Sequence, residues 1–134
     1  MIDKIDTNIL DKAIEYVKIY NDYVILYNEY NDIFDAIDNR EEVNKENLSE
    51  EKLDELIRDT DKLESMNETL KKEFEIKCNA YNKVKYLCMD EDLTELYVFM
   101  ATSIINEEYE NTDIYKKLII EYTNFLYESY NDLD

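Results

Sequence analysis

The chain contains no glycine and no proline among its 134 residues. Hairpin turns, glycine-rich phosphate loops and the nucleophile elbow of α/β-hydrolases depend on glycine, which adopts positive φ and lets the backbone approach a ligand closely. The absence of glycine argues against dinucleotide-binding, P-loop and α/β-hydrolase folds. It also favours long uninterrupted helices, because the two strongest helix breakers are missing.

Histidine is absent as well, which excludes histidine-based acid–base catalysis, Ser-His triads and Glu-x-x-His di-iron sites. Calcium-binding loops would need a glycine at their turn, and this chain has none. Carboxylate-only magnesium sites remain open, and Glu51 with Glu55, or Glu91 with Glu95, could be set in the paired acidic motifs of helical nucleotide pyrophosphohydrolases. The clustered motif that those enzymes require is not convincingly present. We therefore predict a protein that is not an enzyme and has no metal site and no cofactor.

Cysteine is scarce, with only Cys78 and Cys88. On one helix these residues would lie about 15 Å apart along the axis, too far for a disulfide. Both stand among apolar residues, so we predict buried, reduced thiols. The N-terminus lacks a basic start followed by an apolar run, and no segment approaches 18 consecutive apolar residues, so we expect no signal peptide, no transmembrane helix and a cytoplasmic location.

Acidic residues dominate what is present, and the net charge is −19. Residues 90–134 alone contain 12 acids and 2 bases. Such a charge repels nucleic acid and anionic membranes and attracts basic partners. The chain also has 13 Tyr but only two Arg and four Ala, a bias typical of an A/T-rich genome such as that of a low-GC bacterium, its phage or a large virus.

Tyrosines recur along the first part of the chain at alternating gaps of four and three residues, which places them on one face of a helix. This pattern predicts a helix over about 3–38, with Asp6 or Asn8 as an inner cap and Asn39 as a left-handed C-cap. The rings either fill the interior of a bundle or form a partner surface. The aromatic seam consists of Tyr16, Tyr20, Tyr23, Tyr27 and Tyr30.

A heptad pattern of apolar residues predicts a second helix over about 48–89, capped through Asn47 and Glu50 or through Ser49. Its seam is interrupted by the polar residues Thr60, Asn67 and Lys77. Because fewer than ten residues connect the two helices, an antiparallel hairpin is the economical arrangement.

Two shorter helices follow, over about 92–109 and 113–130. We predict that Asp90 or Asp92 caps the N-terminus of the first short helix and that Asn111 caps its C-terminus. This helix is apolar nearly all round, so it should be the most buried of the four. We therefore predict an all-α helical bundle forming a single domain over 1–134. The short helices can cover only about half of the long hairpin. The other half is covered by a second copy or by a partner, or helix one is broken and folds back; we favour a homodimer.

Two sets of carboxylates are candidate partner-binding sites. Glu107, Glu108, Glu110 and Asp113 bracket the expected turn between the two short helices. Asp11, Asp22 and Glu29 repeat along helix one at multiples of about 10 Å, and such a row can imitate DNA phosphates. The alternative is that both sets form an ordinary solvated face.

These features favour a non-enzymatic acidic protein that docks on a basic protein partner, such as a nucleic-acid-binding enzyme, and does not itself bind nucleic acid or membrane. In composition it has the character of DNA-mimic inhibitors of restriction or CRISPR nucleases encoded by phage, and of immunity proteins that neutralise nuclease toxins. The alternative is a self-assembling coiled-coil scaffold, adaptor or chaperone.

Overall fold

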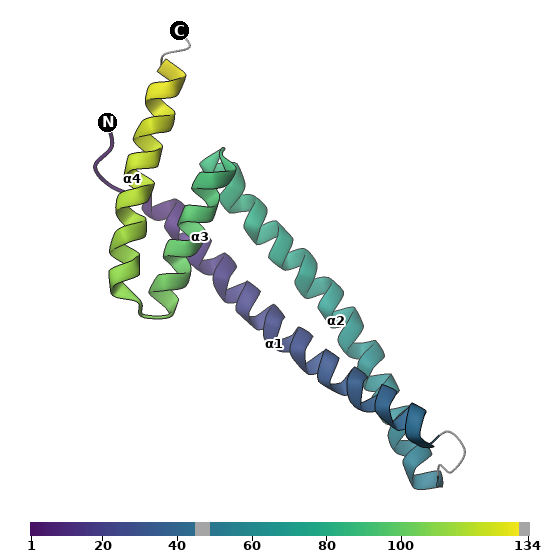
Figure 1. Ribbon diagram of the computed structural model, residues 1–134. Helices are drawn as coiled ribbons and strands as arrows, with labels where there is room; N and C mark the ends of the chain where they lie inside the picture. The colour runs from purple at the N-terminus through teal and green to yellow at the C-terminus, as the bar shows by residue number, and fades with distance from the viewer. Residues whose placement is uncertain (45–48, 132–134) are drawn as a thin grey trace. The chain divides into compact units, whose positions relative to one another are not determined.

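The computed structural model describes the backbone of residues 1–44 and 49–131, and these residues form four α-helices and no strand (Figure 1). The helices are α1 (Thr7–Asn44), α2 (Glu50–Cys88), α3 (Glu91–Ile105) and α4 (Tyr109–Asn131). The predicted all-α bundle of two helical hairpins is confirmed. No helix in the described part of the chain combines the length and the apolar character needed to span a bilayer.

The chain divides into two compact units, Met1–Ile19 with Lys77–Asp134 (unit 1) and Tyr20–Ile76 (unit 2). Both long helices contribute to each unit. The expectation of one domain over the whole chain stays a prediction, and each unit is described by itself.

Unit 1 contains the main apolar core. Its most deeply buried side chains include Ala13 and Val17 of α1, Val84 of α2, Ala101 of α3 and Ile119 of α4. The prediction that the third helix is the most buried is in keeping with its contribution: six of the 15 residues of α3 are buried, namely Leu93, Thr94, Tyr97, Met100, Ala101 and Ser103.

The segment before α1 is held against the rest of unit 1 by hydrogen bonds. The Ile2 amide donates to Asn124 Oδ1 at 2.9 Å, and Asn124 Nδ2 donates to the Ile2 carbonyl at 3.0 Å. Asp6 caps α1, because its Oδ1 accepts from the amides of Asn8 (2.9 Å) and Ile9 (3.2 Å). The predicted Asp6 cap is confirmed, and α1 therefore begins at Thr7 rather than at Asp3.

Helices α1 and α2 pack against each other in both units, as one ring contact in each unit shows. In unit 1 the rings of Tyr16 and Tyr81 meet edge to face with centroids 5.3 Å apart. In unit 2 the rings of Tyr23 and Phe74 meet at 6.0 Å.

The predicted end of the first helix is wrong. Asn39 lies within α1, which continues to Asn44, and Asn39 has no positive φ. The acids Asp35 and Asp38 lie near the predicted end, where the helix macrodipole disfavours negative charge. That cost is only about 0.3–1 kcal/mol, and no glycine is present to stop the helix. Ser49 Oγ accepts from the Lys52 amide at 3.4 Å, which supports the Ser49 cap of α2. Asn47 lies outside the described residues.

The boundary between the short helices is also corrected. The third helix ends at Ile105 rather than near residue 109, and α4 begins at Tyr109, so Asn111 lies within α4 and caps nothing. The amides of Glu107 and Glu108 donate to the carbonyls of Ile104 (3.1 Å) and Ser103 (2.8 Å). These two bonds form a Schellman motif, in which Glu107 takes the left-handed position that glycine usually occupies, with φ of 58°.

Candidate partner-binding site

The α3–α4 turn brings the predicted acidic residues together. Glu107, Glu108 and Glu110 line one shallow hollow of about 380 Å³ with Tyr109 and Asn111. The Tyr109 side chain is 70% exposed, so the hollow offers an aromatic ring among carboxylates. Asp113, one turn further along α4, is exposed but does not line the hollow. The predicted set is therefore a cluster of three glutamates with a neighbouring aspartate.

Hydrogen bonds hold this turn in one conformation. Besides the Schellman bonds, Ser103 Oγ and Thr112 Oγ1 share a hydrogen bond of 2.7 Å that ties the end of α3 to the start of α4. Thr112 Oγ1 also donates to the Glu108 carbonyl at 3.1 Å, and Asn111 Nδ2 donates to Glu108 Oε2 at 3.1 Å. The carboxylates are thus presented from a fixed backbone, which lowers the entropy that a partner must remove on binding.

The charges of this site are not neutralised within the chain. Within residues 1–39 and 49–130, Glu107, Glu110 and Asp113 form no ion pair. Lys116 and Lys117 follow on α4 but do not pair with them in that part of the chain. Glu108 differs from these three residues, because its carboxylate accepts a hydrogen bond from the Asn111 side-chain amide.

The acidic row of α1 is divided between unit 1 and unit 2. Asp11, Asp22 and Glu29 are all exposed, but Asp11 belongs to unit 1 and the other two to unit 2. Asp22 and Glu29 lie seven residues apart on α1, about 10 Å along its axis and on one face. Of the predicted row, only this pair can be described as one surface.

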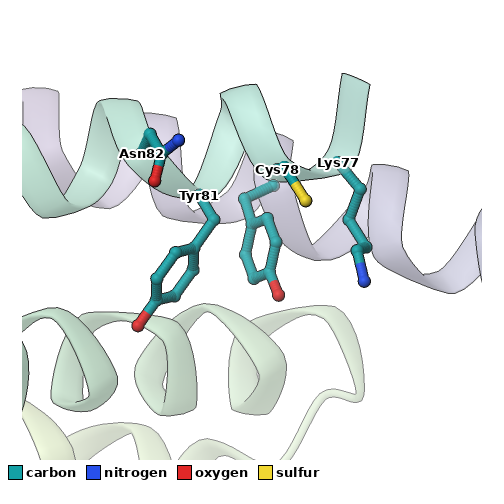
Figure 2. Close-up of a pocket in the computed structure, with 5 residues that line it drawn as sticks. Lys77, Cys78, Tyr81 and Asn82 are labelled. Carbon is teal, nitrogen blue, oxygen red and sulfur yellow. The ribbon is translucent and has the colours of Figure 1, made fainter. Parts of the chain in front are cut away.

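The aromatic seam is shared between the two units. Tyr16, in unit 1, is half-buried and packs against the core. It lines a hollow of about 330 Å³ at the α1–α2 pair together with Lys77, Cys78, Tyr81 and Asn82 (Figure 2). Figure 2 shows the Tyr81 ring extending from α2 on the same side as the Lys77 side chain.

The rest of the seam lies in unit 2 and has an inner and an outer row. Tyr23 and Tyr30 are half-buried, whereas Tyr20 and Tyr27 are 42% and 46% exposed. The interpretations as core and as exposed surface therefore each fit part of the seam. One hollow of about 270 Å³ is lined by Tyr23, Tyr27, Tyr30, Asn67, Leu70, Lys71 and Phe74.

The two cysteines are reduced, as predicted, but both are half-buried rather than buried. Burial raises the pKa of the Cys88 thiol above its ordinary value, although a hydrogen bond with Thr94 lowers it in part. Burial likewise raises the pKa of Tyr97. These groups are neutral at pH 7 and belong to the core rather than to a reactive site.

Sequence reasoning missed two hydrogen bonds that tyrosine hydroxyls form with residues far away in the sequence. The Asp6 amide donates to Tyr97 Oη at 3.0 Å. Asp90 caps α3 by accepting from the Leu93 amide at 2.9 Å, and Tyr122 Oη donates to Asp90 Oδ2 at 3.4 Å. The Asp90 cap was predicted from its place before an apolar run, but its tyrosine partner stands 32 residues away, and no local pattern indicates such a contact.

Sequence reasoning also missed Tyr109 as part of the acidic site, because Tyr109 was predicted to end the third helix.

Another feature that was not predicted is a hollow of about 630 Å³ whose lining includes two lysines. Its residues are Asn8, Lys12, Asn79, Asn82, Lys83, Tyr86 and Leu87.

No cluster of three or more His, Cys, Asp or Glu side chains within the described ranges has the arrangement needed to hold a metal ion. Comparison with known proteins gives no relative: no family model, no curated protein and no solved structure matches this chain.

Proposed function

We propose that this chain is a non-enzymatic binding protein that docks on a basic protein surface through the α3–α4 turn. The observation that carries the proposal is the group of Glu107, Glu110 and Asp113, exposed and without ion pairs in the described part of the chain, beside the 70% exposed ring of Tyr109. The partner would contribute lysine or arginine side chains to this surface.

The chemistry of the turn suits such side chains. A guanidinium or ammonium group seated over the Tyr109 ring gains a cation–π attraction of about 0.5–1 kcal/mol at an exposed site. Carboxylates around the ring add charge-assisted hydrogen bonds. Because the turn is already fixed by its Schellman and Ser103–Thr112 bonds, little ordering accompanies binding.

The charge of the whole chain supports the same proposal at longer range. A net charge of −19 accelerates the approach of a cationic partner and keeps anionic ones away. A nucleic-acid-binding enzyme is the partner class that fits best, since its substrate channel is basic. The function would then be inhibition, as in anti-restriction, anti-CRISPR or nuclease immunity proteins.

The test compares two variants that change the net charge equally. In the turn variant, Glu107→Gln, Glu110→Gln and Asp113→Asn neutralise the site and leave Glu108 to hold Asn111. In the control, Glu95→Gln, Glu121→Gln and Glu128→Gln neutralise three other exposed acids. Each tagged protein is incubated with lysate of a low-GC bacterium at low and at high salt, and the retained proteins are identified by mass spectrometry.

We expect the wild type and the control to retain the same basic nucleic-acid-binding protein at low salt and to release it at high salt. The turn variant should retain little of it. Added duplex DNA should displace the partner if the acidic surface occupies a nucleic-acid channel. Equal retention by the turn variant and the control would refute the proposed site, and retention of no basic protein would refute the proposed partner class.

A further inference from the structure

The hollow of about 630 Å³ in unit 1 is lined by one face of each long helix. Helix α1 contributes Asn8 and Lys12, which stand four residues apart. Helix α2 contributes five residues at spacings of three, four, seven and eight from the first, namely Asn79, Asn82, Lys83, Tyr86 and Leu87. Residues at such spacings share one face of a helix, so the two faces form one continuous surface. We call this surface the amide–lysine hollow.

The size and the lining of the amide–lysine hollow suit a small polar molecule. Pockets for small ligands generally measure about 300–1,000 Å³, and this hollow lies within that range. Six of its seven lining residues carry a polar group, and these groups are three side-chain amides, two ammonium groups and one phenol. A ligand that uses them must itself carry negative charge and several hydrogen-bonding groups.

The hollow lies where the excess of acids in this chain is reversed. Residues 76–89 contain three lysines and no acid, in a chain of 34 acids and 15 bases. Lys83 forms no ion pair within the described ranges. Lys12 pairs with Glu15 at 3.6 Å, but both side chains are exposed, and such pairs contribute little. The ammonium groups are therefore available to an anion.

The charge of the whole chain favours a small anion over a large one. Charges on distant surfaces are screened beyond about 8 Å at physiological salt, whereas the ammonium groups of the hollow act at contact distance. A nucleic acid would extend past the hollow onto acid-rich surfaces, where the net charge of −19 repels it. A small anion meets mainly the local positive charge.

The amides and the phenol ring suit a planar ring with hydrogen-bonding edges. The side chains of Asn8, Asn79 and Asn82 form no hydrogen bond within the part of the chain that the structure describes, so their donors and acceptors remain available. An asparagine amide can bind the edge of adenine through two hydrogen bonds. Tyr86 is 82% exposed, so its ring can stack on a base, and such stacking accepts every base.

We propose that the amide–lysine hollow binds a nucleoside phosphate. The phosphate contacts the ammonium groups of Lys12 and Lys83, and the base stacks on Tyr86 beside the asparagine amides. A nucleoside phosphate is the small anion that uses all three kinds of group in this lining. The site is separate from the acidic turn and does not depend on the function proposed for that turn.

The test titrates the full chain with AMP, GMP, CMP and UMP, each up to about 5 mM, by isothermal titration calorimetry and by NMR of the ¹⁵N-labelled protein. Inorganic phosphate and adenosine are titrated separately, because each carries one part of the proposed ligand. The side-chain amide signals of Asn79 and Asn82 report the hollow, and the signal of Asn111 reports the acidic turn.

Two variants of the hollow are each matched by a control on α4. Lys83→Gln removes an ammonium group, and its control is Lys116→Gln, which removes the same charge from an exposed residue outside the hollow. Tyr86→Leu removes the ring, and its control is Tyr127→Leu, at a ring that is 65% exposed. Circular dichroism reports whether each variant is folded.

We expect at least one nucleoside monophosphate to bind with a Kd below about 1 mM and to shift the Asn79 and Asn82 signals but not that of Asn111. Phosphate and adenosine should each bind at least tenfold more weakly. The Kd should rise at least fivefold in Lys83→Gln and Tyr86→Leu and stay unchanged in both controls.

Three results would overturn the proposal. The first is neither heat nor a shift of the Asn79 and Asn82 signals with any of the four nucleotides at about 5 mM. The second is an equal loss of binding in Lys116→Gln, since the effect would then be one of net charge and not of the hollow. The third is phosphate that binds as tightly as the nucleotides, since the base would then make no contact.

Discussion

Replacing Glu107 by glycine should stabilise the protein, although Glu107 belongs to the proposed binding site. Glu107 has φ of 58° at the C′ position of the Schellman motif that ends α3. In this left-handed region the Cβ of an L-residue lies too close to the following carbonyl oxygen, which costs roughly 1–2 kcal/mol. Glycine has no Cβ and avoids this cost.

The expected gain is smaller than the strain that is removed. Glycine loses more backbone entropy on folding, which offsets roughly 0.5–1 kcal/mol. The net stabilisation should therefore be about 0.5–1 kcal/mol, or about 2–4 °C in Tm for a chain of this size. Glu107 is exposed and forms no ion pair among the described residues, so little side-chain interaction is lost.

The assay is urea unfolding followed by circular dichroism at one fixed protein concentration, because association would shift the apparent stability. Glu107→Gln is the control, since it removes the charge and keeps the Cβ, and it should leave stability nearly unchanged. Met89→Gly is a second instance: Met89 follows α2 with φ of 57°, and its side chain is 86% exposed. If Glu107→Gly and Met89→Gly are both neutral or destabilising, the assignment of left-handed strain to these two caps is wrong.

Three further predictions concern the core of unit 1. Tyr97→Phe leaves the Asp6 amide without its acceptor and should cost about 1–3 kcal/mol in urea unfolding, whereas Tyr109→Phe, at an exposed ring, should cost almost nothing. Ile119→Ala empties a fully buried site and should cost about 2–5 kcal/mol, against less than about 1 kcal/mol for Leu118→Ala at the 41% exposed neighbour. Burial raises the pKa of Cys88 and Tyr97 in the folded state, so at high pH the folded protein retains protons that the unfolded chain releases. The contribution of these two groups to stability is therefore fully present below their ordinary pKa values of 9.0 and 10.0 and is lost as pH rises above them. Cys88→Ala should make that fall shallower between pH 9 and 10, and an unchanged slope would contradict the thiol's part in it.

The helical content was predictable because the signals for it are local. Heptad spacing of apolar residues, the absence of glycine and proline, and caps such as Asp6 and Asp90 all act within a few residues of the helix that they define. These signals located all four helices, and the start of α2 and of α3 to within two residues.

The α3–α4 turn was misplaced because its stop signal is absent from the sequence. A glycine at position 107 would have indicated a Schellman end, but the chain has none, and Glu107 adopts the left-handed conformation instead. The Ser103–Thr112 bond and the two backbone bonds of the motif stabilise this conformation. Their partners become adjacent only after the chain has turned, so local propensity could not reveal them.

The candidate site was predictable in part, because some of the signals for it are local in the sequence. A run rich in glutamate between two helices indicates an exposed acidic turn, and the structure brings Glu107, Glu108 and Glu110 around one hollow. The place of Tyr109 in that hollow follows from where α4 begins, and this boundary was predicted incorrectly. The division of the aromatic seam into inner and outer rows depends on the register of α1 against α2, which one sequence does not specify.

The most direct test of the acidic docking surface is zero-length carbodiimide cross-linking of the partner retained at low salt, followed by peptide mass spectrometry. Carbodiimide joins a carboxylate to a lysine only where the two are in contact, and Glu107, Glu110 and Asp113 are exposed to such contact. We predict cross-links from partner lysines to these three residues, which disappear in the turn variant and persist in the control variant. Cross-links spread evenly over Glu95, Glu121, Glu128 and the turn would contradict the account.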